Sequence, residues 1–78
     1  MKYVYILKSV EGDHFYSGST DDLRNRLRSH NAGQVSHTRK FKPWRLKTYL
    51  AFSDELQAIA FEKYLKSPSG RAFAKKRL

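Results

Sequence analysis

The stretch from Tyr16 to Asn31 concentrates side chains that suit chemistry on a charged substrate. Arg26 and His30 lie four residues apart, so a helix places them one turn apart on the same side. A guanidinium can donate two parallel hydrogen bonds to an oxyanion, and an imidazole can move a proton near neutral pH. The same spacing also fits a structural arrangement, in which Arg26 pairs with Asp22 and His30 is a partly buried helix-end histidine.

Two tyrosines, Tyr5 and Tyr16, are expected to stand close together on one side of a β-hairpin. Residues 2–18 have the β-propensity of a hairpin, and Glu11-Gly12-Asp13 is typical of its turn. A turn centred on Glu11 and Gly12 places Tyr16 opposite Leu7, on the face that carries Tyr5. The pair could handle protons as phenols, or it could simply be two cross-strand aromatic residues in a core.

Glu62 lies within the apolar side of a predicted helix. The helix begins with the cap Ser53-Asp54-Glu55, extends to about Lys66, and flanks Glu62 with Ala58, Ile59 and Leu65. A buried carboxylate needs a cation, hydrogen bonds or an opening to solvent, because an unpaired buried charge is costly. Two interpretations are open at this point: a salt bridge to a neighbouring Lys or Arg, or a ligand for a metal ion.

The remaining elements must position these residues. A helix is predicted over residues 21–31, because Ser19, Thr20 and Asp21 are suitable N-caps and Leu23 and Leu27 form an apolar stripe. Strands are expected over residues 2–9, 14–18 and 45–52, and a short basic helix is expected after Pro68.

Two features separate the first helix from the second. Residues 34–43 form an aperiodic loop, and a loop of this length in a small domain is usually functional. The third strand follows, with Trp44 as an expected core anchor. Its residues Leu46, Thr48, Leu50 and Phe52 alternate with Arg45, Lys47 and Tyr49.

The 78-residue chain has a formal net charge of +9, and this charge is unevenly distributed. Residues 1–33 contribute +1 and residues 34–78 contribute +8. A lopsided basic surface favours a polyanion, above all nucleic acid, although a ribosome or an anionic membrane surface would use the same charge. The residues expected to contact nucleic acid are Arg24, Arg28, Arg39, Lys40, Lys42, Arg45, Arg71, Lys75 and Lys76.

Composition excludes several classes of protein. The chain contains no cysteine, so it has neither disulfides nor a cysteine-based zinc site. Its longest apolar runs are too short for a signal peptide or a membrane span, so a soluble, unprocessed protein is expected. A cytoplasmic location, with association with the nucleoid as an option, fits these features and the basic charge.

Taken together, four segments resemble the GIY-YIG nuclease superfamily in order and spacing, most closely its short single-domain, stand-alone branch. They are Tyr3-Val4-Tyr5, Tyr16-Ser17-Gly18, the run from Leu23 to Asn31, and the run from Phe61 to Lys66. The resemblance implies one nuclease-like domain over residues 1–78 of the α/β (α+β) class. It also implies a three-stranded antiparallel sheet flanked by helices in the order ββαβα, followed by a short C-terminal helix.

The same resemblance implies hydrolysis of phosphodiester bonds with one divalent metal ion, Mg²⁺ or Mn²⁺. At the matching positions, Glu62 is the metal ligand and Arg26 binds the non-bridging oxygens of the phosphate. Tyr5 is the candidate base, Tyr16 positions water or phosphate, and His30 orients Tyr5 or relays its proton.

Three departures from the superfamily pattern bear on this assignment. Tyr3-Val4 replaces Gly-Ile in the first motif and Ser17 replaces Ile in the second, but both motif tyrosines are retained. Some members carry a lysine where this chain has Ser19. Loss of that cation is expected to weaken phosphate binding or activation of the base.

The leading hypothesis is a metal-dependent endonuclease that acts on structured or damaged DNA, in repair or recombination, as a monomer or homodimer without a membrane partner. The alternative is a nucleic-acid-binding module, for DNA or RNA, that turns over slowly or not at all. A third, weaker hypothesis is a ribosome- or RNA-associated protein. A pure binder has no need for Glu62 among apolar residues, which favours the enzyme.

Overall fold

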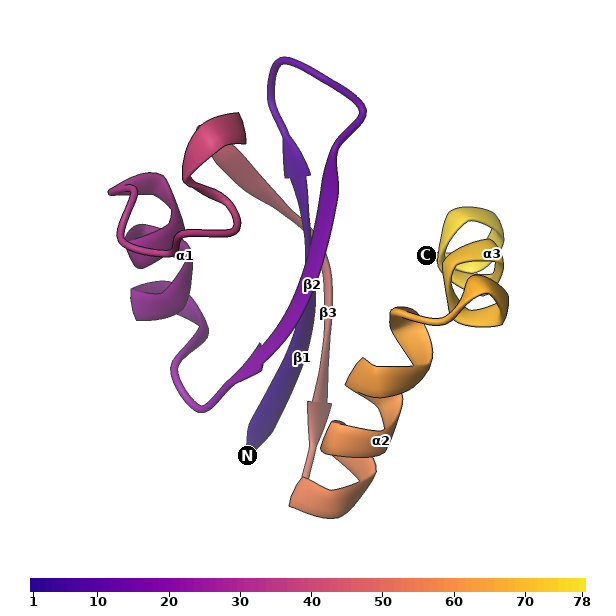
Figure 1. Ribbon diagram of the computed structural model, residues 1–78. Coiled ribbons are helices and arrows are strands. Elements are labelled where there is room, and N and C mark those ends of the chain that lie inside the picture. Colours follow the sequence, from indigo (N-terminus) through magenta and orange to yellow (C-terminus); the bar gives the residue numbers. More distant parts are fainter.

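The computed structural model describes residues 1–78 and contains one antiparallel sheet with helices on both faces (Figure 1). The sheet has the order β2-β1-β3, with β1 at its centre. The strands are β1 (Lys2–Ser9), β2 (Phe15–Thr20) and β3 (Trp44–Phe52), and the helices are α1 (Leu23–Asn31), the 3₁₀ turn η1 (Arg39–Phe41), α2 (Glu55–Leu65) and α3 (Pro68–Arg77). The predicted class and the predicted order of elements are confirmed. None of the helices has the length and apolar character that crossing a membrane requires.

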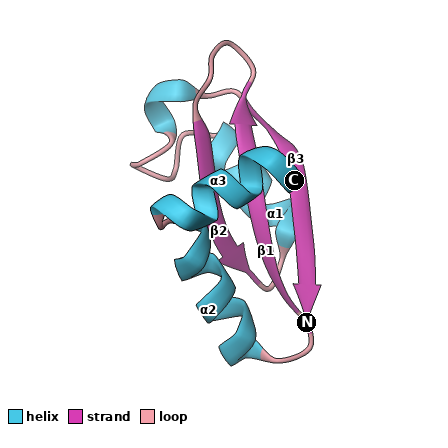
Figure 2. Cartoon of the chain, turned by 90° about the vertical axis from the view of Figure 1, so that its right-hand side faces the viewer, coloured by secondary structure: helices cyan, strands magenta, loops and turns pink.

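Each face of β1 has its own apolar cluster. Figure 2 shows α2 and α3 in front of the sheet and α1 behind it. On the α2 side, Val4 and Ile6 pack with Ala58 and Leu65. On the α1 side, the cluster is formed by Tyr5, Leu7 and Trp44. The central strand is therefore buried on both faces, which explains why both of its alternating faces are apolar.

The hairpin has the predicted register. Tyr16 lies opposite Leu7, and Tyr5 lies opposite Gly18. The return strand runs from Phe15 to Thr20, two residues beyond the predicted end. This extension brings the Ser19 hydroxyl to the edge of the sheet.

The predicted alternation of β3 is confirmed in burial, but a bulge changes the face on which its first residues lie. The pairing with β1 shifts between Ile6 and Leu7, where Thr48 and Leu46 are the respective partners, so Lys47 is an extra residue in a bulge. A one-residue bulge exchanges the faces of the strand. Leu46 therefore packs with the α1-side cluster, whereas Phe52 packs with the α2-side cluster.

The helices begin at side-chain caps and differ from prediction in detail. The Asp22 carboxylate accepts from the backbone N–H of Asn25, so α1 begins at Leu23 rather than at residue 21. In α2, Ile59 is 49% exposed, so the apolar arc is narrower than predicted and Glu62 lies at its margin. The last helix is ten residues long, and Gly70 brings its first turn against the backbone of Tyr64.

Candidate active site

Tyr5 extends from the buried central strand past the neighbouring strand β2. Its ring lies 6.4 Å from the ring of Tyr16, centroid to centroid, so the predicted proximity of the two phenols is confirmed. A side chain at Gly18 would block this path, because an added Cβ would lie 2.6 Å from the Tyr5 hydroxyl oxygen. Gly18 is thus required for close approach of the phenol to the edge of the sheet.

The Tyr5 hydroxyl meets His30 in the core. His30 is fully buried, its Nε2 lies 2.8 Å from the Tyr5 oxygen, and its Nδ1 lies 2.7 Å from the Thr38 hydroxyl. Thr38 donates its own proton to the Val35 carbonyl at 3.4 Å. The imidazole proton is therefore assigned to Nδ1, and Nε2 accepts the hydrogen bond from Tyr5.

Burial sets the protonation of this chain of hydrogen bonds. Desolvation, together with the nearby charge of Arg26, lowers the pKa of His30 to about 4. Desolvation also raises the pKa of the Tyr5 phenol, although the hydrogen bond from Arg26 opposes the rise. At neutral pH the site thus contains a neutral imidazole and a protonated phenol.

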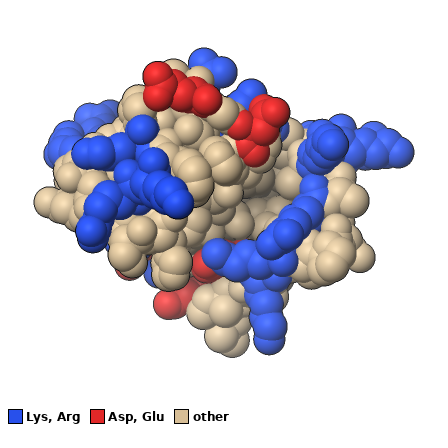
Figure 3. All heavy atoms as spheres, turned by 45° about the horizontal axis from the view of Figure 1, so that its top comes forward, with Lys and Arg blue, Asp and Glu red and all other residues tan.

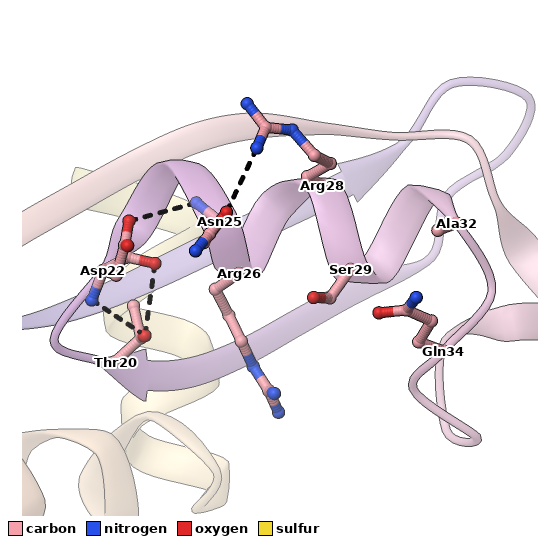
Figure 4. Close-up of a pocket in the computed structure, with 8 residues that line it drawn as sticks. All are labelled: Thr20, Asp22, Asn25, Arg26, Arg28, Ser29, Ala32 and Gln34. Carbon is pink, nitrogen blue, oxygen red and sulfur yellow. Dashed lines mark hydrogen bonds between the residues drawn. The ribbon is translucent and has the colours of Figure 1, made fainter.

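Arg26 approaches the same phenol from α1. Its Nε donates to the Tyr5 oxygen at 3.4 Å, and this hydrogen bond is the main cause that raises the pKa of Arg26. The alternative pairing with Asp22 is not formed, because Asp22 caps the helix and Arg26 extends away from it (Figure 4). Arg26 also lines an open polar pocket of about 410 Å³, with Thr20 and Ser29 among its other residues.

Glu62 lies across β2 from the phenols, on α2. The Ser19 hydroxyl donates to its Oε1 at 2.7 Å, and Lys66 Nζ lies 3.8 Å from its Oε2. The Glu62 side chain is 26% exposed, so its carboxylate has access to solvent. Both a salt bridge and an opening to solvent thus accommodate the charge.

Lys66 places a cation near Ser19, the position at which some members of the superfamily carry a lysine. Its ammonium donates to the Ser17 carbonyl at 2.8 Å and lies 5.0 Å from the centre of the Tyr16 ring. The site therefore has a positive charge beside the second motif, although it comes from α2 rather than from β2.

The donor set fits one hard cation held mainly by water and substrate. No group of three or more His, Cys, Asp or Glu side chains is gathered at any point of the structure. Mg²⁺ is commonly bound in this way, through one or two carboxylates with several retained waters. Glu62, across β2 from the phenols, is the acidic side chain that could hold the cation, and it must loosen its contact with Lys66 to do so.

The nine predicted nucleic-acid contacts are not brought together in one surface. Arg24 and Arg28 lie on α1, the next three lie in the loop that follows it, and Arg45 lies on β3. Arg71, Lys75 and Lys76 lie on α3, across the sheet from α1. Figure 3 likewise shows Lys and Arg side chains on separate parts of the face in view rather than in one patch. Arg71 and Lys75 line a groove of about 920 Å³ that Tyr16 and Lys66 also line.

Two residues of the site were missed from the sequence. Thr38 lies in the aperiodic loop and is fully buried, and only the unusual length of that loop pointed to it. The position of Lys66 was signalled by its spacing of one helical turn from Glu62. Its contact with Tyr16 depends on how α2 packs against the sheet.

Comparison with known proteins matches the whole arrangement to one family. The family model described as the GIY-YIG catalytic domain matches residues 1–77. A UPF0213 protein of Lacticaseibacillus paracasei is 38% identical over 65 residues, which cover 82% of this chain and 72% of that protein. A UPF0213 protein of Bacillus pumilus is 35% identical over 66 residues, covering 83% of this chain and 66% of its own length.

A solved structure supports the same grouping. The solution NMR structure of a UPF0213 protein from Bacillus halodurans is similar with a TM-score of 0.58 at 32% identity, covering 96% of this chain and 81% of that chain. The GIY-YIG domain is a nuclease fold. With the motif residues in register and the family model matching nearly every residue, the chain belongs to the GIY-YIG catalytic domain family.

Proposed function

We propose that this protein is a divalent-metal-dependent endonuclease that hydrolyses phosphodiester bonds in structured or damaged DNA, in a repair or recombination role. The proposal depends on one observation: the hydroxyl oxygen of Tyr5 is hydrogen-bonded to two functional side chains. Tyr5 is hydrogen-bonded to the neutral imidazole of His30 on one side and to the Arg26 guanidinium on the other. A merely structural tyrosine has no need of both a proton acceptor and a cation.

The chain Tyr5–His30 provides a path for the proton of an attacking water. The pKa of His30, about 4, lies far below that of the phenol, which burial raises above its ordinary value of 10.0, so at rest the shared proton lies on Tyr5. In the reaction, Tyr5 takes the proton of water as its own proton moves to Nε2 of His30.

Arg26 and Tyr16 act on the phosphate in this proposal. The guanidinium binds the non-bridging oxygens, on which negative charge increases during attack, and its Nε keeps hold of the phenol. Tyr16 lies beside Tyr5 and His30 and is placed to orient water or phosphate.

Glu62 would hold the metal ion, Mg²⁺ or Mn²⁺. When bound, such an ion supplies Lewis-acid stabilisation of the leaving oxygen. The chain's own contribution is to orient the Glu62 carboxylate, through the hydrogen bond from the Ser19 hydroxyl. Action on chromosomal DNA would place the protein in the cytoplasm, beside the nucleoid.

A second candidate function is a nucleic-acid-binding module with little or no turnover. The observation that favours it is the existing pairing of Glu62 with Ser19 and Lys66, which satisfies the carboxylate without a metal. In that case the basic residues bind nucleic acid while the phenol cluster serves as core.

Cleavage of a panel of labelled DNAs separates the two functions. Duplex, single-stranded, flap, branched and nicked DNAs are incubated with Mg²⁺ or Mn²⁺ and wild type, Glu62→Gln or Tyr5→Phe. Glu55→Gln, on the exposed start of α2, and Tyr49→Phe, on the exposed face of β3, are matched controls. An enzyme loses cleavage in the first two variants alone and still binds DNA. Equal, metal-independent results for all five proteins would contradict the nuclease proposal.

A further inference from the structure

A groove runs between α3 and the face of the sheet covered by α2, beyond the cluster of catalytic candidates. Its volume is about 920 Å³. Figure 2 shows α3 lying across this face of the sheet, and Figure 3 shows a hollow beside a band of Lys and Arg side chains. The groove exists because α3 is held to the end of α2 through the close approach at Gly70.

The rim of the groove is strongly basic. Lys47 from β3, Lys66 from α2, and Arg71 and Lys75 from α3 line it, against the single acid Asp13. Four cations from three separate elements converge on one depression. This charge is complementary to a phosphate chain that passes between them.

The floor of the groove is apolar and offers an aromatic face. Ile6, Leu65 and Ala74 form its aliphatic part. Phe15 also lines it and is 54% exposed, so part of its ring is open to a ligand. An exposed aromatic ring beside cations is the combination on which unstacked nucleotide bases bind.

The groove is continuous with the candidate active site. Tyr16 lines it, and the same ring lies 6.4 Å from the Tyr5 ring. Lys66 also lines it, while its ammonium lies 3.8 Å from the Glu62 carboxylate. A strand whose phosphate lies at Tyr5 and Glu62 would therefore continue directly into the groove.

We propose that this groove binds an unpaired nucleic-acid strand adjacent to the cleaved phosphate, so that the preferred substrate carries a single-stranded segment. A duplex keeps its bases stacked inside and presents phosphates outward, so it would leave Phe15 and the apolar floor uncovered. An unpaired strand can place phosphates on the rim and bases on the floor. The proposal rests on the proposed nuclease function only for the position of the cleaved bond.

Strand binding is tested without metal, in EDTA, by fluorescence anisotropy. The probes are labelled oligo(dT) and oligo(U) of about 12 nucleotides and a blunt duplex of the same length. Phe15→Ala is compared with Tyr49→Ala, an equally exposed strand aromatic outside the groove. Lys75→Gln is compared with Lys63→Gln, an exposed lysine of α2 that does not line the groove.

We expect Phe15→Ala to weaken oligonucleotide binding about 5-fold or more and to leave duplex binding unchanged. Lys75→Gln should also reduce the slope of log K against log salt by about 0.7 for the single strand. Both control variants should stay within about 2-fold of wild type. The tighter of the two oligonucleotides identifies DNA or RNA as the strand. Equal effects of Lys75→Gln and Lys63→Gln, or no effect of Phe15→Ala, would overturn the proposal.

A cleavage arm distinguishes failure of the groove from failure of the nuclease. Blunt duplex and the same duplex with an unpaired flap are incubated with Mg²⁺ and wild type, Phe15→Ala or Glu62→Gln. Cleavage of the flap substrate that falls in Phe15→Ala supports the groove. If wild type and Phe15→Ala cleave both substrates equally and Glu62→Gln cleaves neither, the groove proposal is overturned and the nuclease proposal is supported. If Phe15→Ala weakens oligonucleotide binding but no protein cleaves either substrate, the groove proposal is supported and the nuclease proposal fails.

Discussion

The buried imidazole of His30 leads to a quantitative prediction about folding and pH. Burial and the charge of Arg26 hold the pKa of His30 at about 4, against 6.5 for an unperturbed histidine. Between these values the unfolded chain binds a proton that the folded protein does not. The free energy of unfolding is therefore highest above pH 6.5 and falls as the pH falls toward 4. The contribution is about 3 kcal/mol in total and about 2 kcal/mol between pH 7 and pH 5.

Urea and thermal unfolding, followed by the fluorescence of the buried Trp44, measure this contribution. We expect the wild type to lose about 2 kcal/mol from pH 7 to pH 5, which lowers Tm by about 8–16 °C in a domain of this size. His30→Gln is the comparison, because it removes the titrating group and keeps a side chain that can form hydrogen bonds. Between pH 7 and pH 5, His30→Gln should lose about 2 kcal/mol less unfolding free energy than wild type, since the two proteins share all other titrating groups.

The result that would refute the reasoning is an equal loss of unfolding free energy in wild type and in His30→Gln. If wild type and His30→Gln lose equal stability between pH 7 and pH 5, His30 is not held neutral by the fold. The assignment of the Tyr5 proton as a donor to Nε2 would then fail with it. A direct check is the NMR titration of the His30 ring protons, whose midpoint should lie near pH 4.

Three further variants have expected outcomes. Thr38→Val leaves the buried imidazole N–H without an acceptor and should cost about 1–3 kcal/mol in urea unfolding, whereas Thr38→Ser should recover most of this loss. Gly70→Ala pushes a methyl group into the backbone of Tyr64 and should lower Tm by several degrees, and an unchanged melting curve would contradict the close helix contact. Lys66→Met removes the cation beside Glu62 and should tighten Mn²⁺ binding measured by electron paramagnetic resonance; weaker binding would contradict competition for the carboxylate.

Much of the fold was predictable because local signals agreed with one another. The β-propensity of residues 2–18 predicted a hairpin, and its turn at Glu11 and Gly12 predicted the register that pairs Tyr16 with Leu7. The cap of α2 was recognisable from short polar residues ahead of an apolar stripe, whereas α1 is capped by Asp22 rather than by one of the three polar residues before it. Such patterns act within a few residues, so a sequence displays them directly.

The features that were not predicted depend on packing between distant elements. The bulge at Lys47 leaves the alternating pattern of β3 unbroken in the sequence, although it exchanges the faces of the strand. Thr38 becomes a partner of His30 only when the loop folds back beneath Trp44, whose indole N–H donates to the Thr38 carbonyl. The likeness to a known family named the five candidate residues but not the hydrogen bonds that join them.

Because β1 is covered on both faces, we expect its backbone to be among the slowest in the molecule to open to solvent. Amide hydrogens of a strand covered on both faces exchange with solvent chiefly through global unfolding, whereas those of frayed ends exchange through local opening. Tyr5 belongs to that strand, between Val4 and Ile6 of one cluster and beside Leu7 of the other. We therefore expect the backbone of Tyr5 to stay in place when a substrate binds, and the adjustment to fall on side chains at the edge of the site, such as Lys66 beside Glu62.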